Sequence, residues 1–286
     1  MYAGRFAPSP TGPLHFGSLV AALASWLDAR AAKGRWHVRI EDIDRPREEK
    51  GAAADVLRSL ERLGLYWDGP VVFQSQRNDH YERALQALRM HTYWCGCSRS
   101  EIADSSLGVA TDGAQIYPGT CRSSLPLGKA ARALRVKTGA EKILFHDRVQ
   151  GAQEQILAAE IGDFVLYRAD GQFAYQLAVV VDDAAQSISD VVRGADLLDS
   201  TARQIHLQRL LGYPEPRYLH VPVAVNAAGE KLSKQTGAAP IDWSRKRQLL
   251  AETLRFLGQP DADDLAEAVR NWNPARIPVC RTIALA

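Results

Sequence analysis

The opening of the chain alternates between apolar and polar stretches in a way that predicts a strand, a loop, a helix and a second strand. Residues 2–7 form a short mixed-apolar run, and residues 36–40 alternate as strand residues do. Between them, residues 17–33 carry apolar side chains at helical spacing, and Gly34 follows as a stop signal. This order predicts a parallel sheet that binds ligands beyond the carboxyl ends of its strands.

Later segments continue the α/β pattern. Residues 48–63 carry apolar side chains on one helical face and are followed by Gly64, which predicts a second helix. Residues 177–181 are apolar throughout, which is typical of a strand buried on both faces of a sheet. From about residue 242 the pattern predicts short helices.

Composition and charge exclude several classes of protein. Hydrophobic residues make up 46% and charged residues 24% of the 286 residues, as in a folded globular protein. Lys and Arg number 35 against 33 Asp and Glu, and this +2 balance argues against histone-like binding of nucleic acid but not against a local basic patch. The longest apolar run, residues 19–27, is far shorter than the roughly 18 residues of a membrane span, and no secretory signal opens the chain. We therefore expect a soluble cytoplasmic protein.

Residues 8–18 form a proline-rich loop that runs into the first predicted helix. Free backbone N–H groups and the helix dipole make such a helix start attractive to phosphate. Gly17 would let a nucleotide approach the backbone, and His15 can donate a hydrogen bond to charge that develops on a phosphate oxygen. Taken alone, the loop fits a proline-rich turn with a capping histidine equally well.

Residues 231–235 place two lysines, Lys231 and Lys234, on either side of a hydroxyl. This spacing suits a loop that binds a polyphosphate and neutralises its transition state. A surface Lys-x-x-Lys is usually a solvated face, so the stretch becomes informative only together with the proline-rich loop.

In combination, these stretches resemble the two signatures of the class I aminoacyl-tRNA synthetases, and the likeness covers the chain up to about residue 240. The signature variants occupy residues 15–18 and 231–235. Residues 4–12, 39–44 and 192–196 narrow the resemblance to the glutamyl branch of the family. The resemblance implies an α/β class I fold, in which a Rossmann-type parallel sheet is split by an insertion.

The domain boundaries expected from this resemblance follow a change of character in the middle of the chain. Residues 91–170 hold three of the four cysteines and many turn residues, so we expect them to form the insertion. Residues 1–90 and 171–240 would then form the two halves of the Rossmann-type catalytic domain. Residues 241–286 would form a short helical C-terminal region.

The first signature has Ser18 at its fourth position instead of histidine, a change that the glutamyl branch tolerates. Catalysis would then depend on His15 and Lys234. The resemblance gives catalytic roles to His15, Lys231 and Lys234, and ATP-binding roles to His15, Gly17, Ser18 and Lys234. It also implies that Mg²⁺ accompanies the ATP.

The resemblance further implies a pocket for L-glutamate. Arg5 can contact a carboxylate in a bidentate manner, Glu41 can hold the substrate ammonium, and Ser9 can add a hydrogen bond. The full expected set is Arg5, Phe6, Ala7, Pro8, Ser9, Glu41, Tyr175 and Arg193. Without the resemblance, Glu41 would be interpreted as a solvated strand end and Arg193 as part of a structural ion pair.

Two polar stretches keep alternative interpretations. Asp182 and Asp183 follow the apolar run and suit either Mg²⁺ or a strand-end turn. Residues 74–77 suit either a structural corner or contact with RNA.

The length of the chain distinguishes between members of the glutamyl branch. Only 51 residues follow the second signature, so we expect no anticodon-binding domain and a likeness to the short paralogues. Those paralogues activate L-glutamate with ATP without needing tRNA, then transfer it to queuosine in the anticodon of tRNA(Asp). We expect this activity in a monomer that has no membrane partner. Two alternatives are a truncated enzyme that charges the 3′ end of tRNA(Glu) and a non-catalytic paralogue that binds glutamate or adenylate.

Cys95, Cys97 and Cys121 suggest a metal site in the insertion. Cys-x-Cys is less diagnostic of zinc than Cys-x-x-Cys, and a closed zinc site needs a fourth ligand. Spacing alone favours His91, whereas the resemblance points to Tyr117 as a phenolate ligand. We follow the resemblance and expect one structural Zn²⁺ that stabilises a segment with little core of its own.

Overall fold

The computed structural model describes residues 1–110, 113–232 and 241–285 of the chain. Its first sheet has the parallel order β1 (Ala3–Phe6), β2 (Arg35–Ile40) and β3 (Val72–Phe73). Helix α1 (Phe16–Ala31) connects β1 to β2, so the strand–helix–strand opening expected from the sequence is confirmed.

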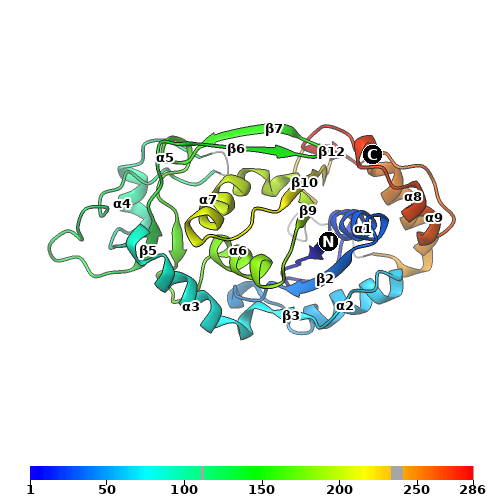
Figure 1. The fold of residues 1–286 in the computed structure, drawn as a ribbon, viewed down its shortest axis with the longest axis horizontal. Coiled ribbons are helices and arrows are strands. Elements are labelled where there is room, and N and C mark those ends of the chain that lie inside the picture. The colour runs from blue at the N-terminus through cyan, green and yellow to red at the C-terminus, as the bar shows by residue number, and fades with distance from the viewer. Residues whose placement is uncertain (111–112, 233–240, 286) are drawn as a thin grey trace.

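A second sheet continues the first one. In it, β9 (Asp190–Gly194) and β10 (Arg217–Val221) are parallel, and the backbone N–H of Ser189, just before β9, donates to the carbonyl of Ala3 at 2.9 Å. Helix α1 lies on one side of these strands, and α6 (Tyr175–Ala185) and α7 (Thr201–Leu211) lie on the other (Figure 1). The mixed α/β class with parallel strands is therefore confirmed.

Glycines decide where the second helix begins and ends. Helix α2 (Ala52–Leu63) ends at Gly64 as expected, where φ is +84°. It begins four residues later than the prediction, because Gly51 adopts φ +86° directly before it. A short 3₁₀ turn, Arg45–Arg47, lies between β2 and this start.

The structure corrects the predicted strand at residues 177–181, which belongs to helix α6. Seven consecutive residues of α6, 177–183, are buried, because the helix packs against α3 (Asn78–Ala87), α7 and β8 (Val165–Tyr167). A helix that is covered all round has no polar face, so its sequence cannot be told from a buried strand by periodicity.

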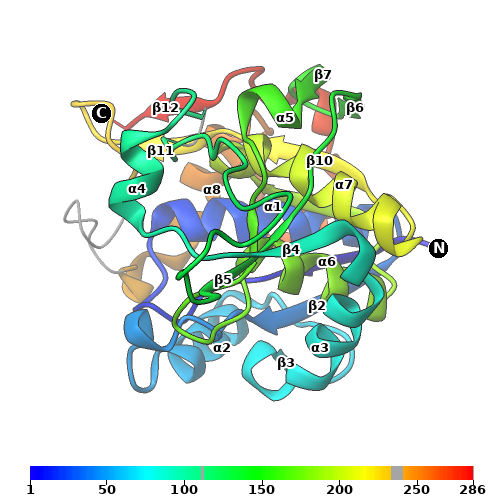
Figure 2. The ribbon, with the colours of Figure 1, turned by 90° about the vertical axis from the view of Figure 1, so that its left-hand side faces the viewer.

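The middle of the chain contributes to two sheets. Strands β4 (Thr92–Cys95), β5 (Ala133–Val136) and β8 (Val165–Tyr167) form a small antiparallel sheet, and the short helix α4 (Arg99–Asp104) follows β4. The short helix α5 (Leu157–Glu160) contacts β7 (Gly151–Ile156) (Figure 2). Strands β6 (Lys142–Asp147) and β7 (Gly151–Ile156) form a hairpin, and β6 pairs with β10 of the second sheet. Part of the expected insertion thus belongs to the sheet of the catalytic region, while the domain boundaries themselves stay a prediction.

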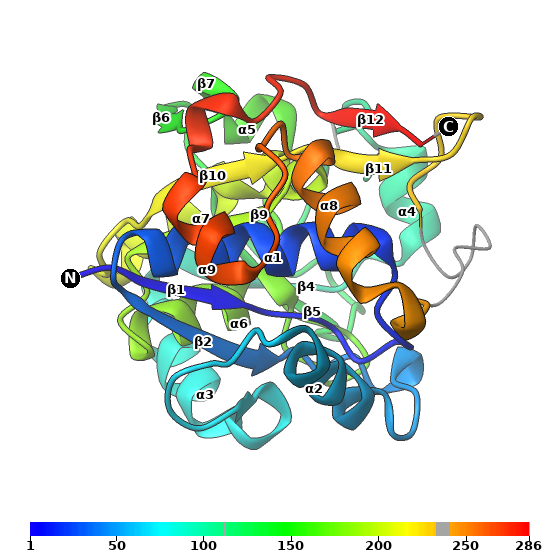
Figure 3. The ribbon, with the colours of Figure 1, turned by 90° about the vertical axis from the view of Figure 1, so that its right-hand side faces the viewer.

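The C-terminal region holds the expected short helices α8 (Lys246–Phe256) and α9 (Leu265–Asn271). It also holds a strand that the sequence did not predict, β12 (Thr282–Ala284), which runs parallel to β11 (Val223–Val225) (Figure 3). Further 3₁₀ turns cover Gln74–Gln76, Arg89–His91, Ala195–Ser200, Trp243–Arg245 and Pro274–Arg276. Within the described ranges, the structure has no helix of the length and apolarity that a membrane span needs.

Candidate active site

His15 is the N-cap of helix α1. Its ring Nδ1 accepts a hydrogen bond from the backbone N–H of Ser18 at 3.4 Å, and Nε2 lies 3.1 Å from the Ser18 hydroxyl. Burial lowers the pKa of His15, and the charge of Lys231 lowers it further, so the ring is neutral near pH 7. Because Nδ1 is the acceptor, the neutral ring carries its proton on Nε2, which can donate to an anionic ligand.

The described part of the second signature, Lys231 and Leu232, lies beside the first signature. A Cβ atom added at Gly17 would come within 3.9 Å of the Leu232 carbonyl oxygen, and Phe16 and Leu232 belong to the same apolar cluster. The Lys231 ammonium lies 2.6 Å from a carboxylate oxygen of Asp196. Lys234, together with the rest of residues 233–240, lies outside the described residues.

Four of the residues expected to bind glutamate converge at the carboxyl ends of the strands. Arg5 lies on β1, Glu41 directly follows β2, Tyr175 begins α6 and Arg193 lies on β9. Burial raises the pKa of the Tyr175 hydroxyl. The positive charges of Arg193 and Arg5 lower this pKa, and the negative charge of Glu41 raises it. Since such charge effects decay with distance, the four side chains share one polar site.

Arg5 is 3% exposed and forms a bidentate ion pair with Asp183 of α6. Its Nε lies 3.2 Å from one carboxylate oxygen, and its Nη2 lies 3.4 Å from the other. Among the described residues, Nη1 has no hydrogen-bond partner, so the edge formed by Nη1 and Nη2 can still receive a second carboxylate. Sequence reasoning found Arg5 but not Asp183, which it placed at the end of a strand.

Glu41 is held in place by a buried arginine. Arg39 donates from Nη2 to the Glu41 carboxylate at 3.2 Å and from Nη1 to Asp183 at 2.8 Å. Burial raises the pKa of Glu41, whereas the charges of Arg39 and Arg5 lower it. The carboxylate therefore sits in a desolvated site where a cationic ligand would stabilise its ionised form.

Arg193 is 5% exposed and makes hydrogen bonds from two of its three nitrogens. Its Nε donates to His220 Nε2 at 3.0 Å, and its Nη2 donates to Thr201 Oγ1 at 3.0 Å and to the Leu197 carbonyl at 3.3 Å. Its Nη1 is buried without a partner in the described part of the chain. A buried N–H left unpaired costs about 1–3 kcal/mol, so this atom marks a position where a ligand oxygen would be stabilised.

The remaining expected pocket residues lie on the loop after β1. The ring of Phe6 is buried and stacks on Trp36 in the core. The carbonyl of Pro8 accepts the backbone N–H of Glu41 at 2.9 Å, which joins the loop to the end of β2. Ser9 is exposed, and Ala7 is half-buried between these positions.

Asp182 and the stretch 74–77 form a structural corner. The Asp182 carboxylate is fully buried and accepts from Gln74 at 2.9 Å, from Tyr81 at 2.8 Å and from Arg77. These donors neutralise and saturate the carboxylate, so the contacts favour a structural role for Asp182 over Mg²⁺ binding. They likewise favour a structural role for residues 74–77 over contact with RNA.

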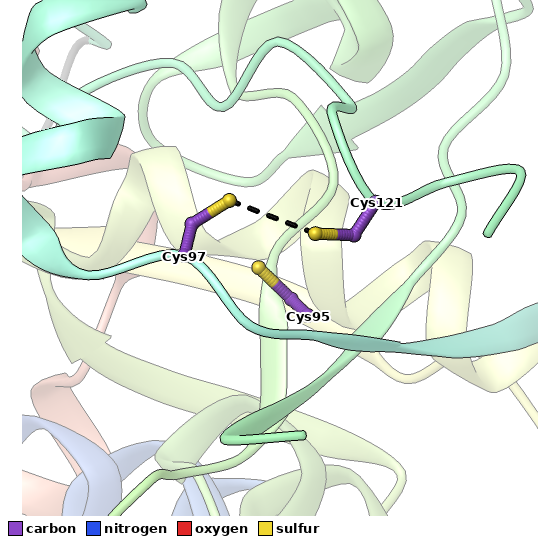
Figure 4. A group of neighbouring side chains, drawn as sticks. All are labelled: Cys95, Cys97 and Cys121. Carbon is purple, nitrogen blue, oxygen red and sulfur yellow. Dashed lines mark hydrogen bonds between the residues drawn. The ribbon is translucent and has the colours of Figure 1, made fainter. Parts of the chain in front are cut away.

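Three thiols converge away from this pocket, at the end of β4 and in the loop that carries Cys121 (Figure 4). The sulfur atoms of Cys95, Cys97 and Cys121 all lie within 4.8 Å of one another, with 3.6 Å between those of Cys97 and Cys121. Cys95 and Cys121 are buried, and Cys97 is partly exposed.

The Tyr117 hydroxyl is the fourth polar atom of the thiol cluster. It lies 3.4 Å from the sulfur of Cys95 and 3.7 Å from that of Cys97. Tetrahedral Zn²⁺ with Zn–S of about 2.3 Å and Zn–O of about 2.0 Å requires ligand separations of about 3.5–3.8 Å. The separations of 3.4, 3.6 and 3.7 Å in this cluster are close to those values. His91 is exposed and is not among the residues grouped around the thiols.

Comparisons with known proteins agree with this geometry. Residues 2–266 match the family described as tRNA synthetases class I (E and Q), catalytic domain. Among curated proteins, the chain is 62% identical over 262 residues to the glutamyl-Q tRNA(Asp) synthetase of Verminephrobacter eiseniae, with 90% of each chain covered. It is 56% identical over 288 residues to the protein of the same name from Aromatoleum aromaticum, covering 97% of this chain and 90% of the relative.

The same fold is found in solved structures. The glutamate-tRNA synthetase of Elizabethkingia anophelis superposes with a TM-score of 0.85 at 23% identity, covering 100% of this chain and 68% of that one. A glutamate tRNA ligase of Elizabethkingia meningosepticum, solved in complex with its amino acid, gives a TM-score of 0.84 at 24% identity, covering 100% and 67%. At these identities the likeness shows a shared fold.

Proposed function

Because the chain belongs to the class I tRNA synthetase family of glutamate and glutamine, we propose that it activates L-glutamate with ATP and transfers the glutamyl group to queuosine in the anticodon of tRNA(Asp). It is a ligase of the class I aminoacyl-tRNA synthetase type, as its close relatives are. The observation that carries the proposal is the convergence of Arg5, Glu41, Tyr175 and Arg193 beside the first signature.

The pocket suits an amino acid with two carboxylates. Arg5 offers the edge of its guanidinium that Asp183 leaves open, and Arg193 offers its unpaired Nη1. The Glu41 carboxylate would take the substrate ammonium. Positive charge for two carboxylates and negative charge for one ammonium match the charges of glutamate at neutral pH.

In the first step, the α-carboxylate of glutamate attacks the α-phosphorus of ATP. A bond forms between the carboxylate oxygen and this phosphorus while its bond to the bridging oxygen breaks, which gives glutamyl-adenylate and pyrophosphate. The Nε2–H of His15, the N-terminus of α1 and Lys234 would stabilise the negative charge that develops on the phosphate oxygens. Mg²⁺ bound with ATP would neutralise phosphate charge.

In the second step, a hydroxyl of queuosine attacks the carbonyl carbon of the mixed anhydride and AMP leaves. In this step the protein would act mainly by positioning the two reactants, which supplies most of the rate, and no side chain is proposed as a base. The thiols of Cys95, Cys97 and Cys121 and the hydroxyl of Tyr117 would hold one Zn²⁺ that stabilises the fold of the segment around β4. We propose that the chain works as a monomer.

The experiment that tests the function locates the transferred glutamate. The full chain is incubated with radiolabelled glutamate, ATP and one of three tRNAs: tRNA(Asp) with queuosine, tRNA(Asp) without it, or tRNA(Glu). Each tRNA is then cleaved into anticodon and 3′-terminal fragments. Label in the anticodon fragment that depends on queuosine is the expected result. Label on the 3′-terminal adenosine of tRNA(Glu) would identify a charging enzyme, and binding without adenylate formation would identify a non-catalytic binder.

A further inference from the structure

A fully buried chain of hydrogen bonds runs from Asp147 through His220 to Arg193. Both Asp147 and His220 are 0% exposed. The Asp147 carboxylate lies 2.6 Å from His220 Nδ1, and His220 Nε2 lies 3.0 Å from Arg193 Nε. The three residues come from β6, β10 and β9, neighbouring strands of one sheet.

The direction of each hydrogen bond in this chain is fixed. Asp147 accepts backbone N–H groups of Val149 at 3.0 Å, Gln150 at 2.8 Å and His220 at 3.2 Å, so its carboxylate is an acceptor on every side. An arginine can only donate, so His220 must accept at Nε2. The proton of the neutral His220 ring therefore lies on Nδ1 and points at Asp147.

These hydrogen bonds hold the Arg193 guanidinium in a single orientation. Its Nε is tied to His220 and its Nη2 to Thr201 and the Leu197 carbonyl, while the group also lies 5.7 Å from the centre of the Tyr218 ring. Only Nη1 remains without a partner among the described residues. A guanidinium fixed before the ligand arrives loses little freedom when it binds a carboxylate.

We infer that Asp147 and His220 are positioning residues that orient Arg193 so that its Nη1 meets a carboxylate of the amino-acid substrate. The inference rests on the proposed function, since it needs glutamate in the pocket. The β6–β7 hairpin contributes to this arrangement, because pairing of β6 with β10 places Asp147 next to His220. A residue of the middle segment thereby acts on amino-acid binding without touching the amino acid.

Two amide variants of His220 separate positioning from general stability. The amide of His220→Gln can place its oxygen near the former Nε2 and accept from Arg193. The shorter amide of His220→Asn can donate to Asp147 but does not reach Arg193. Without an acceptor for its Nε, Arg193 is no longer fixed before glutamate arrives and must be ordered on binding, so we expect His220→Asn to raise the KM for glutamate at least about tenfold.

Pyrophosphate exchange with the full chain measures the KM for glutamate, the KM for ATP and kcat, and the melting temperature is measured in parallel. In His220→Asn the KM for ATP should stay within about twofold, and His220→Gln should keep the KM for glutamate within about threefold. His206→Asn is the matched control. His206 lies on α7 and its ring bonds to the carbonyl of Lys137, just after β5, so its replacement should leave both KM values unchanged.

Equal increases of the KM for glutamate in the Gln and Asn variants, or an equal increase for ATP, would overturn the positioning role. If His220→Asn does not fold, His220→Met takes its place, since methionine has a similar volume and offers no comparable acceptor. Absence of glutamate-dependent exchange in the unmutated protein would instead overturn the proposed function.

Discussion

Arg5 and Asp183 form a bidentate ion pair in which the Nε and Nη2 atoms of the arginine face the two carboxylate oxygens at 3.2 and 3.4 Å. The same Asp183 carboxylate accepts a hydrogen bond from Arg39 at 2.8 Å. One edge of the Arg5 guanidinium is therefore permanently paired, and burial holds the other edge in a fixed direction. That second edge consists of N–H donors only, and this determines which amino acids the pocket can accept.

The unmutated protein should discriminate between glutamate, aspartate and glutamine. Glutamine would point its NH₂ group at the N–H donors of Arg5, and such an unpaired buried contact costs about 1–3 kcal/mol or more, at least tenfold in kcat/KM. Aspartate is one methylene shorter and could not reach Arg5 while Glu41 holds its ammonium. Pyrophosphate exchange should be strong with glutamate, weak with aspartate and almost absent with glutamine.

The variant Arg5→Leu should raise the KM for glutamate and abolish this preference. Arg58→Leu serves as the control, because Arg58 is an exposed residue of α2 and its pairing with Asp55 contributes little. Activation of glutamine as efficiently as glutamate by the unmutated protein would show that Arg5 does not select the side chain.

Local signals in the sequence correctly predicted the helices whose ends are marked by particular residues. Gly64 ends α2 in the left-handed conformation, and His15 caps α1, as their positions predicted. The apolar run of α6 was assigned to the wrong element, because a helix buried on every side and a buried strand share the same pattern.

Partners that are distant in the chain could not be predicted in the same way. Asp183 lies 178 residues from Arg5, and Asp147 lies 73 residues from His220, so no local spacing indicates which acid meets which base. The resemblance supplied the pocket residues that would touch glutamate. It did not supply the acids that orient them, since those depend on strand pairing and helix packing.

Metal content should depend on Tyr117 and not on His91. The Tyr117 hydroxyl lies within 3.4 and 3.7 Å of two cluster sulfurs, whereas His91 is exposed. Burial raises the pKa of the Tyr117 hydroxyl, as do the thiols of Cys121 and Cys95, whereas the backbone N–H of Cys121 lowers it. Because the raising effects prevail, a phenolate forms only where a cation compensates. We expect close to one Zn²⁺ per chain in the unmutated protein and in His91→Ala, and a reduced content in Tyr117→Phe.

Inductively coupled plasma mass spectrometry of the purified proteins measures this content. Full zinc in Tyr117→Phe together with loss of zinc in His91→Ala would reverse the assignment of the fourth ligand. The absence of zinc from all three proteins would mean that the thiols form a metal-free cluster.

The variant Lys234→Ala should lose adenylate formation while it still binds glutamate. Lys234 belongs to the second signature, of which the described residue Leu232 lies beside the start of α1. Glutamate would instead be held by residues on β1, β9 and α6 and at the end of β2. Removal of one preorganised charge from a transition state typically lowers the rate about 10²–10³-fold. Pyrophosphate exchange at saturating ATP measures the rate, and equilibrium dialysis with labelled glutamate measures the binding.

Lys142→Ala is the matched control, because Lys142 is exposed on β6 and pairs with Glu154. Its exchange rate should equal that of the unmutated protein. An unchanged rate in Lys234→Ala would remove this lysine from the catalytic groups.

The pH dependence of stability should report the neutral state of His220. Burial lowers the pKa of His220 to about 4, the hydrogen bond to Asp147 raises it, and the charge of Arg193 lowers it. In the unfolded chain the pKa is about 6.5, so between these values the unfolded state binds more protons and the free energy of unfolding falls as the pH falls. Acidification from pH 7 to pH 4.5 should therefore lower the stability of the unmutated protein by about 2–3 kcal/mol more than that of His220→Gln.

Urea unfolding of both proteins at the two pH values measures this difference, in which the contributions of the carboxylates that do not contact residue 220 cancel. Asp147 stays ionised over this range, because the His220 hydrogen bond and the backbone N–H groups of Val149 and Gln150 outweigh burial and hold its pKa at about 2. If His220 were instead an imidazolium paired with this carboxylate, its pKa would be raised on folding and the sign would reverse. The unmutated protein would then lose less stability than His220→Gln on acidification, and Nε2 could not accept from Arg193.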